Sequence, residues 1–137
     1  MNTYNFRILK IAIHNINRLK TNKFKLDSLI GFAAEEKIDI IGINETNIIE
    51  QQGKFLVKKE SNYAGFWTGA NENKIKGSGV GLLISKEWEK HIGKVTRLSN
   101  YYIDALLMFK KFKLVVISIY ILSSNKEERK KIQQKVI

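Results

Sequence analysis

The chain has 137 residues, 44% of them hydrophobic, which fits one globular domain and argues against a disordered chain. There are 24 Lys and Arg residues against 13 Asp and Glu residues. The net charge of +11 favours a polyanionic partner, such as nucleic acid or an acidic membrane surface, although a Lys-rich solubilising surface would carry the same charge. Cysteine is absent, which excludes a disulfide framework and a thiolate metal site.

Hydrophobic periodicity predicts strands and helices along the chain. The predicted strands comprise residues 7–16, 38–43, 63–70, 79–85, 94–98, 101–109 and 113–121. A first helix, residues 24–37, carries apolar side chains at helical spacing: Leu26, Leu29, Ile30, Ala33 and Ala34. A second helix is expected to begin at Ser124, which forms a capping box with Glu127.

The order of these elements predicts the fold class. A β-α-β unit followed by antiparallel strands and a helix is typical of an α/β or α+β layered sandwich. The last helix acquires apolar side chains only at Ile132, Val136 and Ile137, so we expect residues 1–137 to form a single, incomplete domain. The most apolar segment, residues 114–122, is too short to cross a bilayer, and no signal peptide is evident. We therefore expect an intracellular protein, cytoplasmic or nuclear, with no membrane span.

Two polar clusters follow predicted strands. One contains Asn15 and Asn17, and the other contains Glu45 between Asn44 and Thr46. Ligands bind at the carboxyl ends of strands in layered α/β sheets, and carboxylate and amide oxygens suit Mg²⁺ or Ca²⁺ better than zinc. The same residues have simpler interpretations: the asparagines form a turn, and Glu45 is a loop carboxylate paired with a lysine.

Other motifs are less informative. The segment KGSGVGLLIS, residues 76–85, lacks the G-x-x-x-x-G-K-[ST] pattern, and its glycines open a strand, so we interpret them as sites of close backbone packing and not as a phosphate loop. Trp67, Trp88 and Tyr101 are expected in the core or on a sheet face, and not as base-stacking platforms.

Four segments, in order and at fitting spacing, resemble motifs of the endonuclease/exonuclease/phosphatase superfamily, which has the DNase I-like fold. LKIAIHNINRL (9–19) resembles the opening strand, which ends in N-[IV]-[ND]-G. KLDSLIGFAAEEKIDIIGINETNI (25–48) resembles the first helix and the second strand, which ends in Q-E-T. KGSGVGLLISKEW (76–88) resembles the strand K-G-G-V-A/G-I-L-I, and LVVISIYILSSN (114–125) the strand that ends in Y-x-P.

The resemblance implies a set of site residues and a cofactor. The family hydrolyses phosphodiester or phosphomonoester bonds with a divalent metal, here expected to be Mg²⁺ or Mn²⁺. Glu45 matches the metal-binding carboxylate, and Asn17 matches a residue that supports the metal site. Asn15 matches the catalytic asparagine beside the metal and the scissile phosphate, and Tyr120 matches the tyrosine whose hydroxyl reaches the phosphate.

The chain also departs from the family pattern. Arg18 replaces the glycine of the first motif, Asn44 the glutamine before the glutamate, Asn47 the lysine after the threonine and Leu122 the proline. Two family motifs, G-D-x-N and the terminal Asp-His pair that supplies the general base, do not occur in these residues. General-base catalysis contributes about 10²–10⁴-fold, so we expect little independent activity.

The missing motifs also imply a truncated fold. We expect the chain to supply only the first of the two packed sheets and its flanking helices. The inner face of that sheet, containing Val115, Ile117 and Ile119 or the alternate set, would then lack its partner sheet. Such an exposed apolar face predicts a homodimer, association with a second protein fragment, or aggregation.

These observations lead to one function and two alternatives. The first is a truncated or degenerate metal-dependent phosphodiester hydrolase of the endonuclease type. Its charge favours nucleic acid, DNA more than RNA, bound by Arg18, Lys20 and Lys76. The alternatives are a non-catalytic basic nucleic-acid-binding module of the same fold and a fragment of a phosphoinositide-type phosphatase.

Overall fold

The computed structural model describes residues 8–19, 24–48, 50–69 and 78–121. The strands are β1 (Ile11–Asn15), β2 (Ile40–Asn44), β3 (Tyr63–Trp67), β4 (Val80–Ser85), β5 (Ile92–Ser99), β6 (Tyr102–Met108) and β7 (Lys113–Ile119). The helices are α1 (Phe24–Glu35), α2 (Glu50–Gly53) and α3 (Lys86–Glu89). Each predicted strand has a counterpart, whereas α2 and α3 were not predicted. The helix expected from Ser124 lies outside the described residues.

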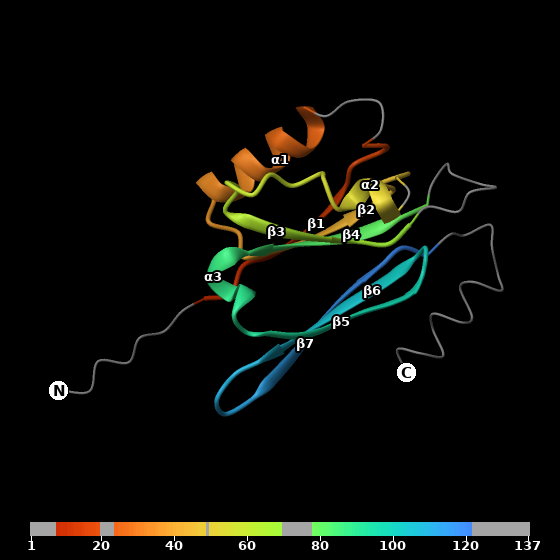
Figure 1. Ribbon diagram of the computed structural model, residues 1–137. Coiled ribbons are helices and arrows are strands. Elements are labelled where there is room, and N and C mark those ends of the chain that lie inside the picture. The colour runs from red at the N-terminus through yellow and green to blue at the C-terminus, as the bar shows by residue number, and fades with distance from the viewer. Residues whose placement is uncertain (1–7, 20–23, 49, 70–77, 122–137) are drawn as a thin grey trace.

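The strands form two sheets that pack face to face (Figure 1). Sheet A has the order β1-β2-β4-β3, with β1 parallel to β2 and the other pairs antiparallel. Sheet B is the antiparallel meander β5-β6-β7. The helix α1 covers the face of sheet A that points away from sheet B, which gives a layered α/β sandwich (Figure 1).

Sheet A is the central layer, and alternate residues of its strands enter two different cores. On β2, Ile41 and Ile43 pack with Leu26 and Ala33 of α1. Ile40, whose side chain lies on the opposite face of the strand, packs between the two sheets with residues such as Ile103 of β6. A strand buried on both faces needs a continuous apolar sequence, and this explains the predicted burial of residues 38–43.

The helix α1 follows its apolar periodicity, but it ends two residues before the predicted boundary. Lys37 adopts a left-handed φ of +56°. The amide of Lys37 donates to the carbonyl of Ala34 (3.2 Å), and the amide of Ile38 donates to that of Ala33 (2.9 Å). These two bonds satisfy carbonyls that the last turn would leave open, so the chain leaves the helix here and enters β2.

The expectation that the chain supplies only the first sheet is wrong, because the described residues form parts of both. The inner face of sheet B therefore has a partner. Val116 and Ser118 point toward sheet A and are buried, whereas Val115 and Ile117 lie on the outer face, 53% and 40% exposed. The inner face of β7 is therefore formed by the alternate set of residues, which includes Val116 and Ser118.

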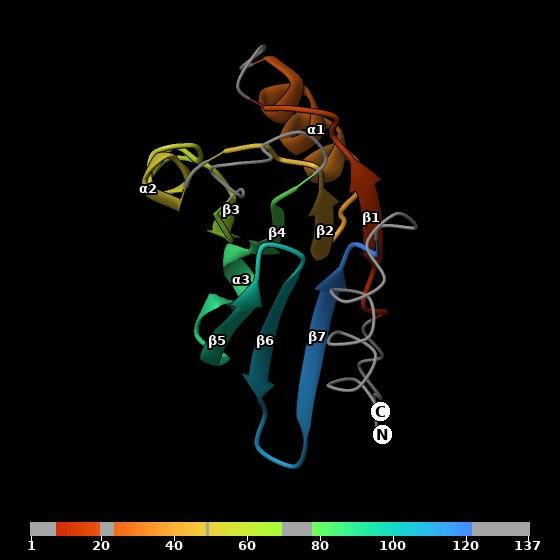
Figure 2. The same cartoon turned by 90° about the vertical axis from the view of Figure 1, so that its right-hand side faces the viewer.

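In the part of the chain that the structure describes, one side of the sandwich is open. The strands β1 and β7 are both edge strands and lie on the same side (Figure 2). Since β7 packs over β2 and β4, no described strand of sheet B lies over β1. Ile11 and Ile13 pair with Ile40 and Gly42, so they lie on the face that sheet B covers elsewhere, and they are 53% and 78% exposed. Among the described residues, no helix has the length and hydrophobicity needed to span a membrane.

Candidate metal and phosphate site

The two asparagines after β1 form a turn. The side-chain oxygen of Asn15 accepts a hydrogen bond from the amide of Asn17 (3.0 Å). Asn17 and Arg18 then adopt left-handed φ angles of +47° and +70°. Asparagine tolerates both roles because its short side chain hydrogen-bonds its own backbone. The turn interpretation therefore accounts for the Asn15 side chain, and it places the side chains of Asn17 and Arg18 in exposed positions at the end of β1.

The loop after β2 lies beside this turn. The parallel register pairs Asn15 with Asn44, and the pairing continues when the amide of Arg18 donates to the carbonyl of Glu45 (2.8 Å). Glu45 has a left-handed φ of +57°. Asn47, also left-handed, is buried, and its side-chain oxygen accepts from the amide of Ser78 (3.1 Å). Asn47 thus anchors this loop to the segment that precedes β4.

A side-chain hydrogen bond between Tyr120 and Glu45 joins the two sheets at this end. The hydroxyl of Tyr120 donates to Oε1 of Glu45 over 2.6 Å, although the residues are 75 positions apart. Tyr120 is held in place because its amide donates to the carbonyl of Tyr101 (3.0 Å) and the two rings stack. The hydrogen bond to Glu45, followed by burial, raises the pKa of Tyr120 to about 12. Among the described residues, Glu45 is therefore paired with a neutral hydroxyl.

Two buried oxygen atoms flank Glu45 without a hydrogen-bond partner among the described residues. They are Oδ1 of Asn44 and Oγ1 of Thr46. Buried polar atoms are nearly always satisfied by protein, water or an ion, so these two oxygens lack the partner that such atoms ordinarily have. The donors near Glu45 are all oxygens, which fits Mg²⁺ or Mn²⁺. Within the described ranges, no three His, Cys, Asp or Glu side chains gather into a group that could hold a metal ion.

The structure gathers most of the predicted site residues at one end of the sandwich. Asn15 ends β1 and is followed by Asn17 and Arg18, whereas Glu45 follows β2 and Tyr120 follows β7. Lys20 and Lys76 lie outside the described residues. Sequence reasoning missed Lys25, whose ammonium group contacts the turn after β1. It treated Asn47 only as a departure from the family pattern, although Asn47 has a structural role here.

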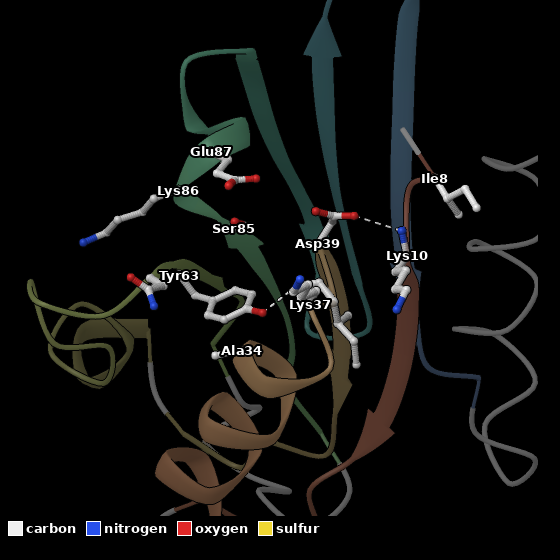
Figure 3. A pocket seen from close by; sticks show the side chains of 11 residues that line it. Ile8, Lys10, Ala34, Lys37, Asp39, Tyr63, Ser85, Lys86 and Glu87 are labelled. Carbon is white, nitrogen blue, oxygen red and sulfur yellow. Dashed lines mark hydrogen bonds between the residues drawn. The ribbon is translucent and has the colours of Figure 1, made fainter. Parts of the chain in front are cut away.

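A larger hollow, of about 670 Å³, lies at the opposite end of sheet A (Figure 3). Its most buried charged group is Asp39, which accepts hydrogen bonds from the amide of Lys10 and from Nε1 of Trp88, both 2.9 Å long. Lys86 extends away from Asp39 (Figure 3) and bonds to the carbonyl of Lys59. The hydrogen bonds of Asp39 and Lys86 thus serve the fold. Trp67 and Tyr101 are buried and Trp88 is half-buried and hydrogen-bonded, as expected for core and sheet-face aromatics.

No family model and no curated protein matches this chain. Solved structures do match. An AP endonuclease from Leishmania major is 13% identical with a TM-score of 0.64, over 92% of this chain and 44% of its own. The endonuclease domain of TRAS1, a telomere-specific non-LTR retrotransposon, is 14% identical with a TM-score of 0.62, over 93% and 52%. The catalytic domain of Xenopus laevis APE2 is 15% identical with a TM-score of 0.57, over 93% and 50%.

The chain therefore spans about half the length of these structures. All three have one fold in common, and nearly all of this chain superposes on it. At this low identity the similarity concerns the fold and not the activity. The chain has the DNase I-like fold that these three structures share.

Proposed function

We propose that the chain is part of a divalent-metal-dependent phosphodiester hydrolase of the endonuclease type, with Glu45 as its metal-binding carboxylate. The observation that carries the proposal is the 2.6 Å contact between the Tyr120 hydroxyl and Glu45 at one end of a DNase I-like sandwich. The three solved structures described above are endonucleases or carry a catalytic domain, and the net charge of +11 suits a nucleic-acid substrate.

The proposal assigns a role to each of the candidate site residues. Glu45 holds Mg²⁺ or Mn²⁺ with support from Asn17 and from the orphaned oxygen of Asn44. A metal bound there would neutralise charge on the phosphate oxygens. Tyr120 remains a hydrogen-bond donor because its pKa is about 12, and with substrate bound its hydroxyl would donate to a phosphate oxygen in place of Glu45. Asn15 is the catalytic asparagine beside the scissile phosphate in this proposal, and Arg18, Lys20 and Lys76 bind the nucleic-acid backbone.

The chain has little activity by itself in this proposal, because it supplies only one part of the catalytic constellation. The family motifs for the nucleophilic water and the general base do not occur in its 137 residues. A second protein fragment or a second copy of the chain would cover the open side at β1 and β7. An intracellular nucleic acid, DNA more than RNA, is the substrate class that we propose.

Metal binding provides the sharpest test. We expect Mn²⁺ to broaden the amide NMR signals of Asn15 and Glu45 in the wild-type chain, and Glu45→Ala to weaken Mn²⁺ binding at least about tenfold, because it removes the carboxylate to which we assign the metal. Glu60→Ala is the matched control, since Glu60 is exposed and distant in sequence. The same variants are compared in a nicking assay on plasmid DNA in the presence of Mg²⁺. Robust cleavage that survives Glu45→Ala would overturn the site assignment.

The alternative of a non-catalytic nucleic-acid-binding module is favoured by the charge alone. It predicts DNA binding that needs no Mg²⁺ and weakens steeply with salt. If about three phosphates are contacted, the logarithm of the binding constant falls with a slope of about −3 against the logarithm of the salt concentration. Arg18→Gln should make that slope shallower by about one. Binding that is independent of both salt and Mg²⁺ would count against both functions.

A further inference from the structure

Three consecutive carbonyl groups converge on one ammonium group beside the candidate site. Nζ of Lys25, in the first turn of α1, donates to the carbonyl oxygens of Asn17 (2.6 Å), Ile16 (3.3 Å) and Arg18 (3.4 Å). We call these three oxygens the carbonyl cradle. They point the same way because Asn17 and Arg18 are both left-handed. An ordinary extended strand would direct successive carbonyls to opposite sides.

The amides of the same turn have other partners. Those of Ile16, Arg18 and Leu19 donate to the last residue of β2 and the loop after it, over 3.1, 2.8 and 3.0 Å, and that of Asn17 donates to the side chain of Asn15. The turn therefore directs its amides toward β2 and its carbonyls toward α1. Three converging carbonyl dipoles repel one another and must be satisfied by water or by a cation. An ammonium group has three donors and a full charge, so it matches the cradle in both respects.

We propose that Lys25 is a positioning residue whose ammonium group acts as a tethered cation in the carbonyl cradle. By holding the turn 16–18, it holds Asn15, Asn17 and Arg18 beside Glu45. The link to Glu45 is direct, because the amide of Arg18 donates to the carbonyl of Glu45 (2.8 Å). The roles of the positioned residues rest on the proposed function. The carbonyl cradle itself rests only on the backbone geometry.

The cradle should accept a free cation once its own is removed. A surface hollow of about 460 Å³ lies beside it, lined by Lys25, His14, Ile16, Ser28, Leu29 and Phe32. In a Lys25→Ala chain, this hollow gives a small primary ammonium ion access to the three oxygens. Methylammonium can donate N–H bonds there, whereas tetramethylammonium carries the same charge and has no N–H group.

Amide hydrogen exchange measured by NMR tests the cradle directly. We expect Lys25→Ala to accelerate exchange at Arg18 and Leu19 about tenfold or more, since hydrogen bonds to charged groups are among the strongest in proteins. Methylammonium should restore slow exchange and tetramethylammonium should not. Lys25→Arg, which keeps a charged donor, should remain near the wild type. Lys111→Ala, at an exposed lysine of the β6–β7 turn, is the matched control.

The outcomes separate the inference from the proposed function. Unchanged exchange in Lys25→Ala, or equal rescue by both ammonium ions, would overturn the cradle. If the wild type binds no Mn²⁺, the proposed metal site fails, and the cradle is still judged by exchange. If the wild type binds Mn²⁺, Lys25→Ala should weaken that binding and methylammonium should recover it. If Lys25→Ala does not fold, the rate of reductive methylation in the wild-type chain tests the cradle instead. We then expect Lys25 to react several-fold more slowly than Lys111, and equal rates would contradict the cradle.

Discussion

At the scale of single residues, the pairing of Tyr120 with Glu45 makes a measurable prediction. The hydrogen bond from the Tyr120 hydroxyl to Glu45 is the largest cause that raises its pKa to about 12. Glu45→Ala removes that bond and the nearby negative charge, so we expect the pKa of Tyr120 to fall toward its ordinary value of 10.0. Titration of ¹³C-labelled tyrosine by NMR measures this change.

Tyr102 is the internal control for this titration. Burial is the largest cause that raises its pKa to about 12, followed by its hydrogen bond to Asp104, and Glu45→Ala alters neither. Because both folded-state pKa values lie above 10.0, both hydroxyls contribute stability that is fully present below pH 10 and lost as the pH rises toward 12. An unchanged Tyr120 pKa in Glu45→Ala would contradict the contact.

At the scale of elements, the segment that enters β4 depends on a glycine. Gly79 has a φ of +87°, and a Cβ atom there would collide with Oγ1 of Thr46, the residue after Glu45. A left-handed conformation costs a residue with a Cβ about 1–2 kcal/mol, and the collision adds to that cost. We expect Gly79→Ala to lower the free energy of unfolding by about 2 kcal/mol or more, measured by urea denaturation.

Gly31 provides a control of opposite sign. It lies within α1, and a Cβ atom there would meet nothing within 4 Å. Gly31→Ala should therefore raise the free energy of unfolding by about 0.5–1 kcal/mol, since alanine is the better helix former. A neutral Gly79→Ala, or a loss equal in the two variants, would show that the close approach to Thr46 is unimportant.

The elements also show what the sequence could predict. Strands and α1 follow from apolar periods of two and 3.6 residues, and the core residues Ile41 and Ala33 obey those periods. The shape of the loops could not be predicted, because it depends on left-handed backbone at Arg18 and Glu45, residue types for which this conformation is uncommon. The contact of Lys25 with the turn depends on that backbone, so no local pattern indicates it.

At the scale of the whole molecule, the division of the strands into two sheets cannot be predicted from hydrophobic periodicity. Strand alternation correctly indicates that β7 has one buried face, but it cannot tell which other strand covers that face. The pairing of β4 with both β2 and β3 completes sheet A and leaves β5, β6 and β7 to form the second layer. The resemblance placed Glu45 and Tyr120 in one site, whereas their spacing of 75 residues indicates nothing by itself.

The open side of the sandwich predicts how the isolated chain behaves in solution. Ile11 and Ile13 are exposed on a face that is buried along the rest of sheet A, and β7 has an unpaired edge beside them. Burying a side chain such as Ile13 contributes about 2 kcal/mol, whereas the net charge of +11 opposes the approach of two copies. We therefore expect self-association that becomes stronger as salt screens the charge, measured by sedimentation velocity. Ile13→Lys should shift the chain toward monomer. Phe55→Lys is the control: Phe55 is 86% exposed, but it follows α2 and lies on neither β1 nor β7, so we expect no shift. A wild-type chain that remains monomeric at high protein and salt concentrations would show that the exposed face of β1 drives no association.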